Sequence, residues 1–301
     1  MEGYLSAKES VEKYIEGSRT KFQSSFLQLF SKAIMAGAMI AFGAAASSVA
    51  AHTVSDVGLA RLAAAVVFPV GLMMVILLGA ELFTGDCMIA MSVMDGKQKL
   101  GDLIRVLFVV YLGNFVGATL LAGGIVLSGQ LDYTAGMLGA YTIKVAIGKT
   151  NISFEQGIVS GILCNILVCA AVLMAGCAKD ITGKLMASFF TIMLFVTAGF
   201  EHCVANMYYI TAGLLAKSNS EYVRLAMETY GYSQNTLDGL NVTNFLVTNL
   251  VPVTIGNILG GVLFLAVPMY CLNIQKEKKN RVEVKEKRDV ICTTVFADSA
   301  H

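Results

Sequence analysis

Two short stretches place ionisable and amide side chains inside strongly apolar sequence. Residues 199–206 are Gly-Phe-Glu-His-Cys-Val-Ala-Asn, and residues 79–86 are Gly-Ala-Glu-Leu-Phe-Thr-Gly-Asp. In each stretch a glutamate lies two positions after the first glycine, and an Asn or Asp lies seven positions after the same glycine. Ionisable groups at membrane depth are costly and usually face a protein interior or a water-filled path. The chain therefore contains the same polar arrangement twice.

The side chains of these stretches suit a site for a small anion. His202 is the only histidine within an apolar run, and an imidazole titrates near neutral pH in water, so it is the natural proton-responsive group. A buried histidine satisfied by its neighbours is the alternative interpretation. Glu81 and Glu201 would repel an anion, so we expect them to anchor broken backbone or to pair with Lys149.

Broken helices would complete such a site. A helix interrupted at membrane depth frees N–H and C=O groups that need partners, and the start of a half-helix favours an anion. Thr84 offers a hydroxyl there, and Asp86 or Asn206 could cap a restarting half-helix. The histidines and cysteines show no metal-ligand spacing. The sequence therefore predicts an anion site with no metal and no cofactor.

The composition predicts an integral membrane protein around these stretches. Of 301 residues, 56% are hydrophobic and 14% are charged, whereas soluble domains are about 25% charged. The net charge of +1 argues against a nucleic-acid partner. Six apolar spans are long enough to cross a bilayer as helices, and we place them near residues 26–51, 60–83, 104–128, 157–178, 185–216 and 246–273.

Other segments flank or join the spans of the transmembrane domain, which covers residues 26–273. Residues 1–25 have one apolar helical face, which predicts an amphipathic helix on the membrane surface or against a neighbouring subunit. We expect loops over residues 129–156 and 217–245, and a charged cytoplasmic tail over residues 274–301.

The second and fifth spans are irregular, because the polar stretches interrupt them. The third and sixth spans share the pattern Gly-Asn-x-x-Gly, at residues 113–117 and 256–260. Three spans per half is an odd number, so a duplicated half must be inverted; this predicts repeats over about residues 26–128 and 157–273. We interpret the Gly-x-x-x-G spacing itself mainly as close helix packing.

Bulky apolar residues lie around the predicted breaks. Such residues can narrow or gate a pore by dewetting, although ordinary core or lipid-facing positions are the common alternative. The candidates are Phe68, Leu72, Leu82, Phe83 and Phe195.

The distribution of basic residues predicts the orientation. Most of the 22 Lys and Arg residues lie on the side of the N-terminus if six spans are crossed. The segments on the other side hold only Arg61, Lys144, Lys149, Lys217 and Arg224. The positive-inside rule then predicts that both termini are cytoplasmic and that the protein lies in the cytoplasmic membrane.

These motifs together resemble those of the formate/nitrite transporter family. The likeness is carried by residues 79–86, Lys149, Gly161-Ile162-Leu163-Cys164-Asn165 and residues 199–207, and it covers about residues 20–273. The resemblance implies an all-α, aquaporin-like membrane fold in a homopentamer, with an anion pore through each protomer.

The resemblance also implies roles for particular residues. His202 would face Thr84 at the pore centre, with Asn165 completing the hydrogen bonding there. Lys149 would concentrate anions near the mouth by its positive field. Phe68 and Phe195 would form the outer constriction, and Leu72 and Leu82 the inner one.

Within the family the chain is most similar to the hydrosulfide-channel branch, which also passes formate and nitrite-like ions. We therefore expect a passive, pH-sensitive channel for hydrosulfide, formate or nitrite, and not an enzyme. Proton-coupled formate or nitrite symport through the same site is the main alternative. A neutral-solute pore of the aquaporin kind is a second, although the chain lacks paired Asn-Pro-Ala motifs. A membrane-bound enzyme or redox carrier is disfavoured, because the chain has no nucleophile–base pair, paired axial histidines or Gly-rich phosphate loop.

Overall fold

Six helical spans form the body of the protein, as the computed structural model of residues 3–275 shows. They are α2 (Phe26–Ala51), the pair α3 (Val57–Val67) and α4 (Val70–Leu78), α7 (Leu100–Leu127), α9 (Phe154–Cys177), α10 (Ile181–Ala198) and a last span over Asn244–Gln275. The described residues are all helical apart from turns and one isolated bridge. This confirms the predicted all-α fold class with six spans.

The second and fifth spans are both interrupted, as predicted, and each interruption begins at a glycine. Helix α4 ends at Gly79 (φ +66°), and a short half-helix follows as α5 (Phe83–Asp86), η1 (Cys87–Ile89) and α6 (Ala90–Met94). Helix α10 ends at Gly199 (φ +75°), and the half-helix α11 (Cys203–Ala216) follows. Both glycines are left-handed, a conformation that is costly for residues with a Cβ atom, so each can turn the chain sharply.

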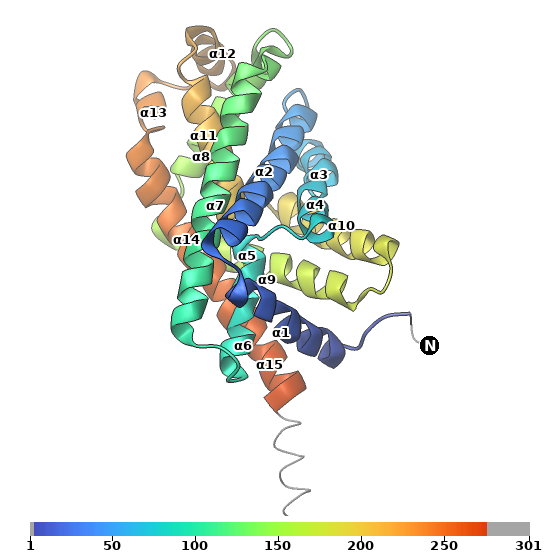
Figure 1. Ribbon diagram of the computed structural model, residues 1–301. Helices are drawn as coiled ribbons and strands as arrows, with labels where there is room; N and C mark the ends of the chain where they lie inside the picture. Colours follow the sequence, from blue (N-terminus) through green and yellow to red (C-terminus); the bar gives the residue numbers. More distant parts are fainter. Residues whose placement is uncertain (1–2, 276–301) are drawn as a thin grey trace, which may run out of the picture.

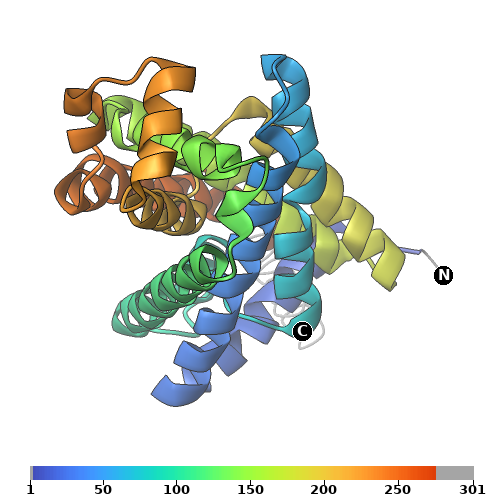
Figure 2. The same ribbon diagram turned by 90° about the horizontal axis from the view of Figure 1, so that it is seen from above.

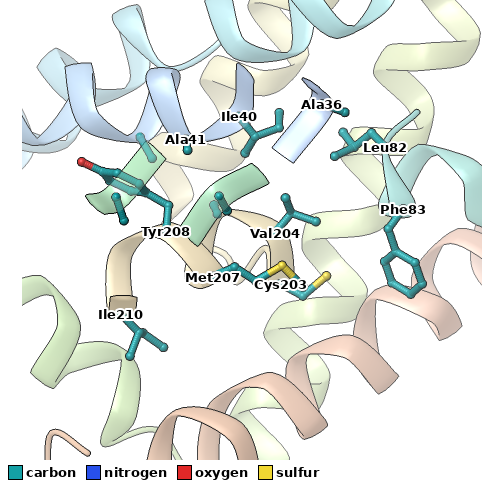
Figure 3. Packing of buried hydrophobic residues seen from close by; sticks show 14 of the residues in the cluster. Ala36, Ile40, Ala41, Leu82, Phe83, Cys203, Val204, Met207, Tyr208 and Ile210 are labelled. Atoms are coloured by element: carbon teal, nitrogen blue, oxygen red, sulfur yellow. The ribbon is translucent and has the colours of Figure 1, made fainter. Parts of the chain in front are cut away.

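The two breaks lie in one packed core. Figure 1 shows α2 and α7 crossing the molecule side by side, with α5 and α11 behind them. Figure 3 shows Ile40 and Ala41 of α2 over Val204 and Met207 of α11, with Leu82 and Phe83 of the first break beside them. The core therefore joins both polar stretches.

Close helix packing at the Gly-x-x-x-G pairs is also confirmed. A Cβ atom at Gly117 would overlap the carbonyl oxygen of Ile34 on α2, and one at Gly260 would overlap that of Ile162 on α9. Glycine is therefore needed where α7 meets α2 and where the last span meets α9. Figure 2 shows α7 lying beside α2 when the molecule is seen from above.

The last span is less regular than predicted. It begins with the wide π-type turns of η3 (Asn244–Leu250) and continues through α14 (Val251–Leu259), η4 (Gly260–Ala266), α15 (Val267–Tyr270) and η5 (Cys271–Gln275). Pro252 and Pro268 follow two of the wide turns. Proline lacks an N–H donor and crowds the preceding turn, which is a common cause of such local widening.

Two predicted loops are instead largely helical. Residues 129–156 contain η2 (Gln130–Asp132) and α8 (Met137–Thr150), and residues 217–245 contain α12 (Ser220–Tyr230) and α13 (Gln234–Asp238). Helix α8 packs on α11 and buries Ile143 and Ile147. The prediction was wrong because it assigned helices only to segments long enough to span a bilayer, and these helices are shorter than that.

The N-terminal helix α1 (Ala7–Gln23) confirms the predicted amphipathic helix, but its apolar face packs elsewhere than predicted. Its apolar residues Val11, Ile15 and Phe22 are buried against the protomer's own α7, α9 and η5. This face therefore covers neither the membrane surface nor another subunit, because the core of the same chain already buries it. Helices α1 and α15 lie at one end of the molecule, and α12 and α13 lie at the other (Figure 1). Of the predicted tail, residues 276–301 lie outside the described part.

Candidate functional site

The two breaks bring Thr84 and His202 together at the centre of the protein. Thr84 Oγ1 lies 2.9 Å from His202 Nε2, and both residues are almost completely buried. His202 is also the N-cap of α11, because its Nδ1 accepts a hydrogen bond from the Ala205 N–H at 3.1 Å. Since Nδ1 accepts, the resting ring is neutral and its Nε2–H donates to the threonine hydroxyl.

Two asparagines hold the broken backbone in the same way in each repeat. Asn114 Oδ1 accepts from Phe83 N–H (2.9 Å), while its Nδ2 donates to the carbonyls of Ala33 (2.8 Å) and Glu81 (2.9 Å). The bonds to Phe83 and Glu81 satisfy groups that the first break frees, and the bond to Ala33 ties the break to α2.

The equivalent Asn257 makes three matching bonds. Its Oδ1 accepts from Cys203 N–H (2.9 Å), and its Nδ2 donates to the carbonyls of Gly161 (2.8 Å) and Glu201 (3.0 Å). Sequence reasoning found the motif that contains both asparagines but assigned it to glycine packing alone. The duplicated Asn next to the glycine was the signal for this second role.

Asn165 joins the two repeats at the centre. Its Nδ2 donates to the Thr84 carbonyl at 3.1 Å and to the Asn257 carbonyl at 2.6 Å. The amide nitrogen of Asn165 is therefore committed to backbone and holds the threonine loop against the last span.

A first cavity, the α8 vestibule, lies on the side of α8 and measures about 150 Å³. Lys149 and His202 line it, as do the aromatic rings of Phe68 and Phe195, which meet edge to face with centroids 5.6 Å apart. Lys149 Nζ pairs with Glu201 Oε1 at 2.7 Å. Of the two glutamates predicted to pair with Lys149, Glu201 is therefore the one that does so.

A ring of side chains fixes this ion pair. Glu201 Oε2 accepts from Asn206 Nδ2 at 2.6 Å, and the same Nδ2 donates to Asn249 Oδ1 at 2.9 Å. Asn249 Nδ2 closes the ring by donating to the Lys149 carbonyl at 2.8 Å. Asn206 therefore supports the glutamate and does not cap α11 as predicted, because His202 already holds the N-cap position.

A second cavity, the α1 vestibule, lies on the side of α1 and measures about 350 Å³. Leu72 and Leu82 line it, together with Glu81 and Asp86. Lys21 of α1 binds the carboxylates of both Glu81 and Asp86. Burial would lower the pKa of Lys21, but the two carboxylates outweigh it and hold that pKa above its usual value. The expectation that Glu81 pairs with Lys149 is wrong, because Lys21 lies beside it instead.

Sequence reasoning missed Lys21 because it placed residues 1–25 on the membrane surface or against a neighbouring subunit, away from the breaks. The side chains of Tyr14, Ser18 and Lys21 follow helical spacing, and the first two also bind the half-helix: Tyr14 O–H donates to the Gly85 carbonyl (2.9 Å), and the hydroxyls of Ser18 and Ser92 share a hydrogen bond (2.6 Å). That polar stripe beside an apolar face was the available signal. Asp86, predicted as a cap, is a partner of Lys21, and Leu82 occupies the N-cap position of α5.

Phe83 differs from the other predicted constriction residues. Its ring packs edge to face on Tyr111 of α7, with centroids 4.8 Å apart, and it lines neither vestibule. Within residues 3–275 no three His, Cys, Asp or Glu side chains gather as a metal ion would require.

The chain is similar to known transport proteins. A family model described as formate/nitrite transporter matches residues 8–271. The formate channel FocA of Haemophilus influenzae is 37% identical over 243 residues, which cover 79% of this chain and 84% of that protein. A probable formate transporter of Methanothermobacter thermautotrophicus is 35% identical over 250 residues, covering 77% of this chain and 84% of that one.

Solved structures are similar over most of the chain. A pentameric formate channel with formate bound has a TM-score of 0.73 at 32% identity, covering 82% of this chain and 97% of that one. A structure described as an FNT family ion channel has a TM-score of 0.75 at 25% identity, covering 88% of this chain and 98% of that one.

Proposed function

The chain belongs to the formate/nitrite transporter family, and from that premise we propose that it is a passive, pH-sensitive channel for small monovalent weak-acid anions. The observation that carries the proposal is the contact between Thr84 and His202, at 2.9 Å, where two inverted helix breaks converge between two vestibules. Formate is the first permeant to test, because the similar proteins are named for formate. Hydrosulfide and nitrite are the other candidates.

The proposed path runs from one vestibule to the other. Lys149 draws the anion into the α8 vestibule, where the aromatic pair of Phe68 and Phe195 removes its water. The anion then meets the hydroxyl of Thr84 and the Nε2–H of His202. It leaves past Leu72 and Leu82 into the α1 vestibule. Hydrogen-bond donors at the centre replace part of the water that the anion has lost.

His202 is the proposed source of the pH sensitivity. The resting imidazole is neutral, because Nδ1 accepts the Ala205 N–H. A second proton on the ring would break that bond and would place a positive charge in a dry centre, which is costly. An anion beside the ring supplies the balancing negative charge. A proton taken up from the vestibule water and the anion are therefore held at His202 together. The ring passes this proton to the anion, which crosses the dry section as its neutral acid and then gives the proton back to the ring. The ring becomes neutral again when it releases the proton to the water of the same vestibule.

The membrane arrangement is part of the proposal. The basic residues on the side of α1 indicate that this side is cytoplasmic, so the α1 vestibule would face the cytoplasm. Large apolar side chains such as Phe190 and Leu194 on α10 are exposed on the isolated protomer. Lipid or neighbouring protomers would cover them, and a homopentamer is the proposed assembly because one similar structure is a pentameric channel.

A flux comparison tests the proposal. Proteoliposomes should pass formate, hydrosulfide and nitrite much faster than chloride, which is not a weak-acid anion. His202→Asn retains an N–H donor and an oxygen that can cap α11, so it removes only the proton chemistry. We expect this variant to lose the pH dependence, and Thr84→Ala to reduce the flux. Wild-type rates and an unchanged pH profile in both variants would contradict the mechanism.

Proton-coupled symport is the second candidate, since a neutral ring that binds proton and anion together also suits it. A measurement of the reversal potential distinguishes the passive channel from proton-coupled symport. A potential set by the anion gradient alone supports the channel, and one that also follows the proton gradient supports symport.

A further inference from the structure

The two repeats differ in charge at one equivalent position. Glu81 and Glu201 occupy the same place in the two breaks, and the residue five positions later is Asp86 in one repeat and Asn206 in the other. In the α8 vestibule, Lys149 and Glu201 balance each other. In the α1 vestibule, the partly buried ammonium of Lys21 faces two carboxylates. These three groups carry a net charge of −1 when both carboxylates are ionised.

The surroundings of Asp86 do not suit an ionised carboxylate beside that of Glu81. Asp86 is buried to 2% exposure and Glu81 to 6%. Oδ1 of Asp86 binds Lys21, but Oδ2 is buried and has no hydrogen-bond partner among residues 3–275. An unpartnered, buried carboxylate oxygen is costly, and two carboxylates in one site usually retain a proton between them.

Asn206 shows which arrangement this position favours. Its Nδ2 donates to the neighbouring glutamate at 2.6 Å. A carboxylate cannot donate such a bond, whereas a carboxylic acid of the same shape can. Because Lys21 Nζ binds oxygens of both Asp86 and Glu81, these two side chains lie close enough to share a proton.

We propose that Asp86 and Glu81 form a proton-binding site in the α1 vestibule, with the proton on Asp86 Oδ2 and donated to Glu81. With the proton bound, the cluster of Lys21, Glu81 and Asp86 is neutral overall, like the pair in the α8 vestibule. When the proton leaves to the water on the α1 side, the cluster gains one negative charge.

The other groups around Asp86 do not remove this difference. Lys32 of α2 lies 3.9 Å from Glu81 Oε1, but its side chain is 48% exposed and therefore screened by solvent. Tyr14 of α1 donates its O–H to the Gly85 carbonyl. The thiol of Cys169 on α9 donates to the Thr84 carbonyl, and that of Cys87 on η1 donates to the Phe83 carbonyl. None of these groups donates to Asp86 Oδ2.

The site has a consequence that rests on the proposed function. A negative cluster repels anions, so anion uptake from the α1 side should fall as the pH on that side rises. Charges that line a cleft change association rates by about tenfold or more. The α8 vestibule has an amide at this position and should show no matching effect.

Infrared spectroscopy tests the proton site without reference to transport. A protonated carboxyl group has a carbonyl-stretch band that a carboxylate lacks. At neutral pH, Asp86→Asn should remove one such band from the wild-type spectrum. Asp102→Asn is the matched control, because Asp102 lies in the first turn of α7, outside both vestibules. If Asp86→Asn removes no more of this band than the control does, the proposal is wrong, whatever the flux.

Flux measurements test the consequence. The pH is varied on the α1 side alone, with formate as permeant. Asp86→Asn mimics the protonated state, so at high pH it should pass about tenfold more formate than the wild type, with equal flux at low pH. Asn206→Asp should add a similar pH dependence on the α8 side. An Asp86→Asn profile identical to the wild type would overturn the regulatory role. Absence of flux in every variant, with the infrared band present, would instead contradict the proposed function.

Discussion

The Lys149–Glu201 pair offers the sharpest separation of structure from transport. The two side chains are 18% and 10% exposed and lie 2.7 Å apart. Replacing one partner of a buried ion pair leaves the other charge uncompensated, which costs roughly 3–5 kcal/mol. Because Lys149 keeps some solvent contact, Lys149→Met should lie near the lower limit, at about 3 kcal/mol. Asn206 still donates to Glu201, so this loss should weaken the fold without abolishing it.

A second substitution should restore the stability. In Lys149→Met with Glu201→Gln neither charge is left, so most of the lost stability should return, because neutral replacement of a buried pair is often nearly without cost. Transport should not return. The ammonium of Lys149 lines the α8 vestibule, whereas Glu201 does not, so without Lys149 the vestibule presents no cation to an entering anion. Formate flux should therefore stay about tenfold below wild type in both variants.

The assay measures both quantities on the same preparations. Thermal unfolding in detergent should give a reduced midpoint for Lys149→Met and a midpoint near wild type for the double variant. Initial formate flux into proteoliposomes should be low for both. Recovery of flux together with stability would refute the reasoning, since Lys149 would then only hold the fold.

Three further predictions concern the fold. Asn257→Leu leaves the Cys203 N–H and two carbonyls without their partner, so it should cost at least about 3 kcal/mol and reduce the folded yield measured by size-exclusion chromatography. Gly199→Ala places a Cβ at φ +75°, which should cost about 1–2 kcal/mol and lower the unfolding midpoint. Burial and the hydrogen bond to Asp132 raise the pKa of Tyr222 to about 12. The folded protein holds the Tyr222 proton more tightly than the unfolded chain does. The stability that Tyr222 contributes to the fold is therefore present below about pH 10 and is lost as the pH rises to about 12. Unfolding midpoints against pH should be flatter in Tyr222→Phe.

The sequence predicted the interrupted spans because polar and ionisable residues divide two apolar runs, and such residues are costly at membrane depth. Gly79 and Gly199 do take the left-handed conformation that such a break requires. The cation of the α1 vestibule could not be found in the same way. Lys21 lies on a helix outside the apolar spans, and only the packing of α1 beneath the first break brings it to Glu81. Local pattern predicts where a helix breaks, whereas partners distant in sequence depend on tertiary packing.

The placement of charge bears on why a monovalent ion would be favoured. The centre holds only neutral dipoles, those of Thr84, His202 and Asn165, and the breaks themselves are held by carboxamides. The charged side chains lie in the two vestibules, whose linings also contain apolar side chains. The cost of removing an ion from water grows steeply with its charge, and neutral dipoles offset only part of it. A monovalent anion that takes up one proton becomes neutral and crosses such a centre at low cost, whereas a divalent anion would still carry a charge after the same step.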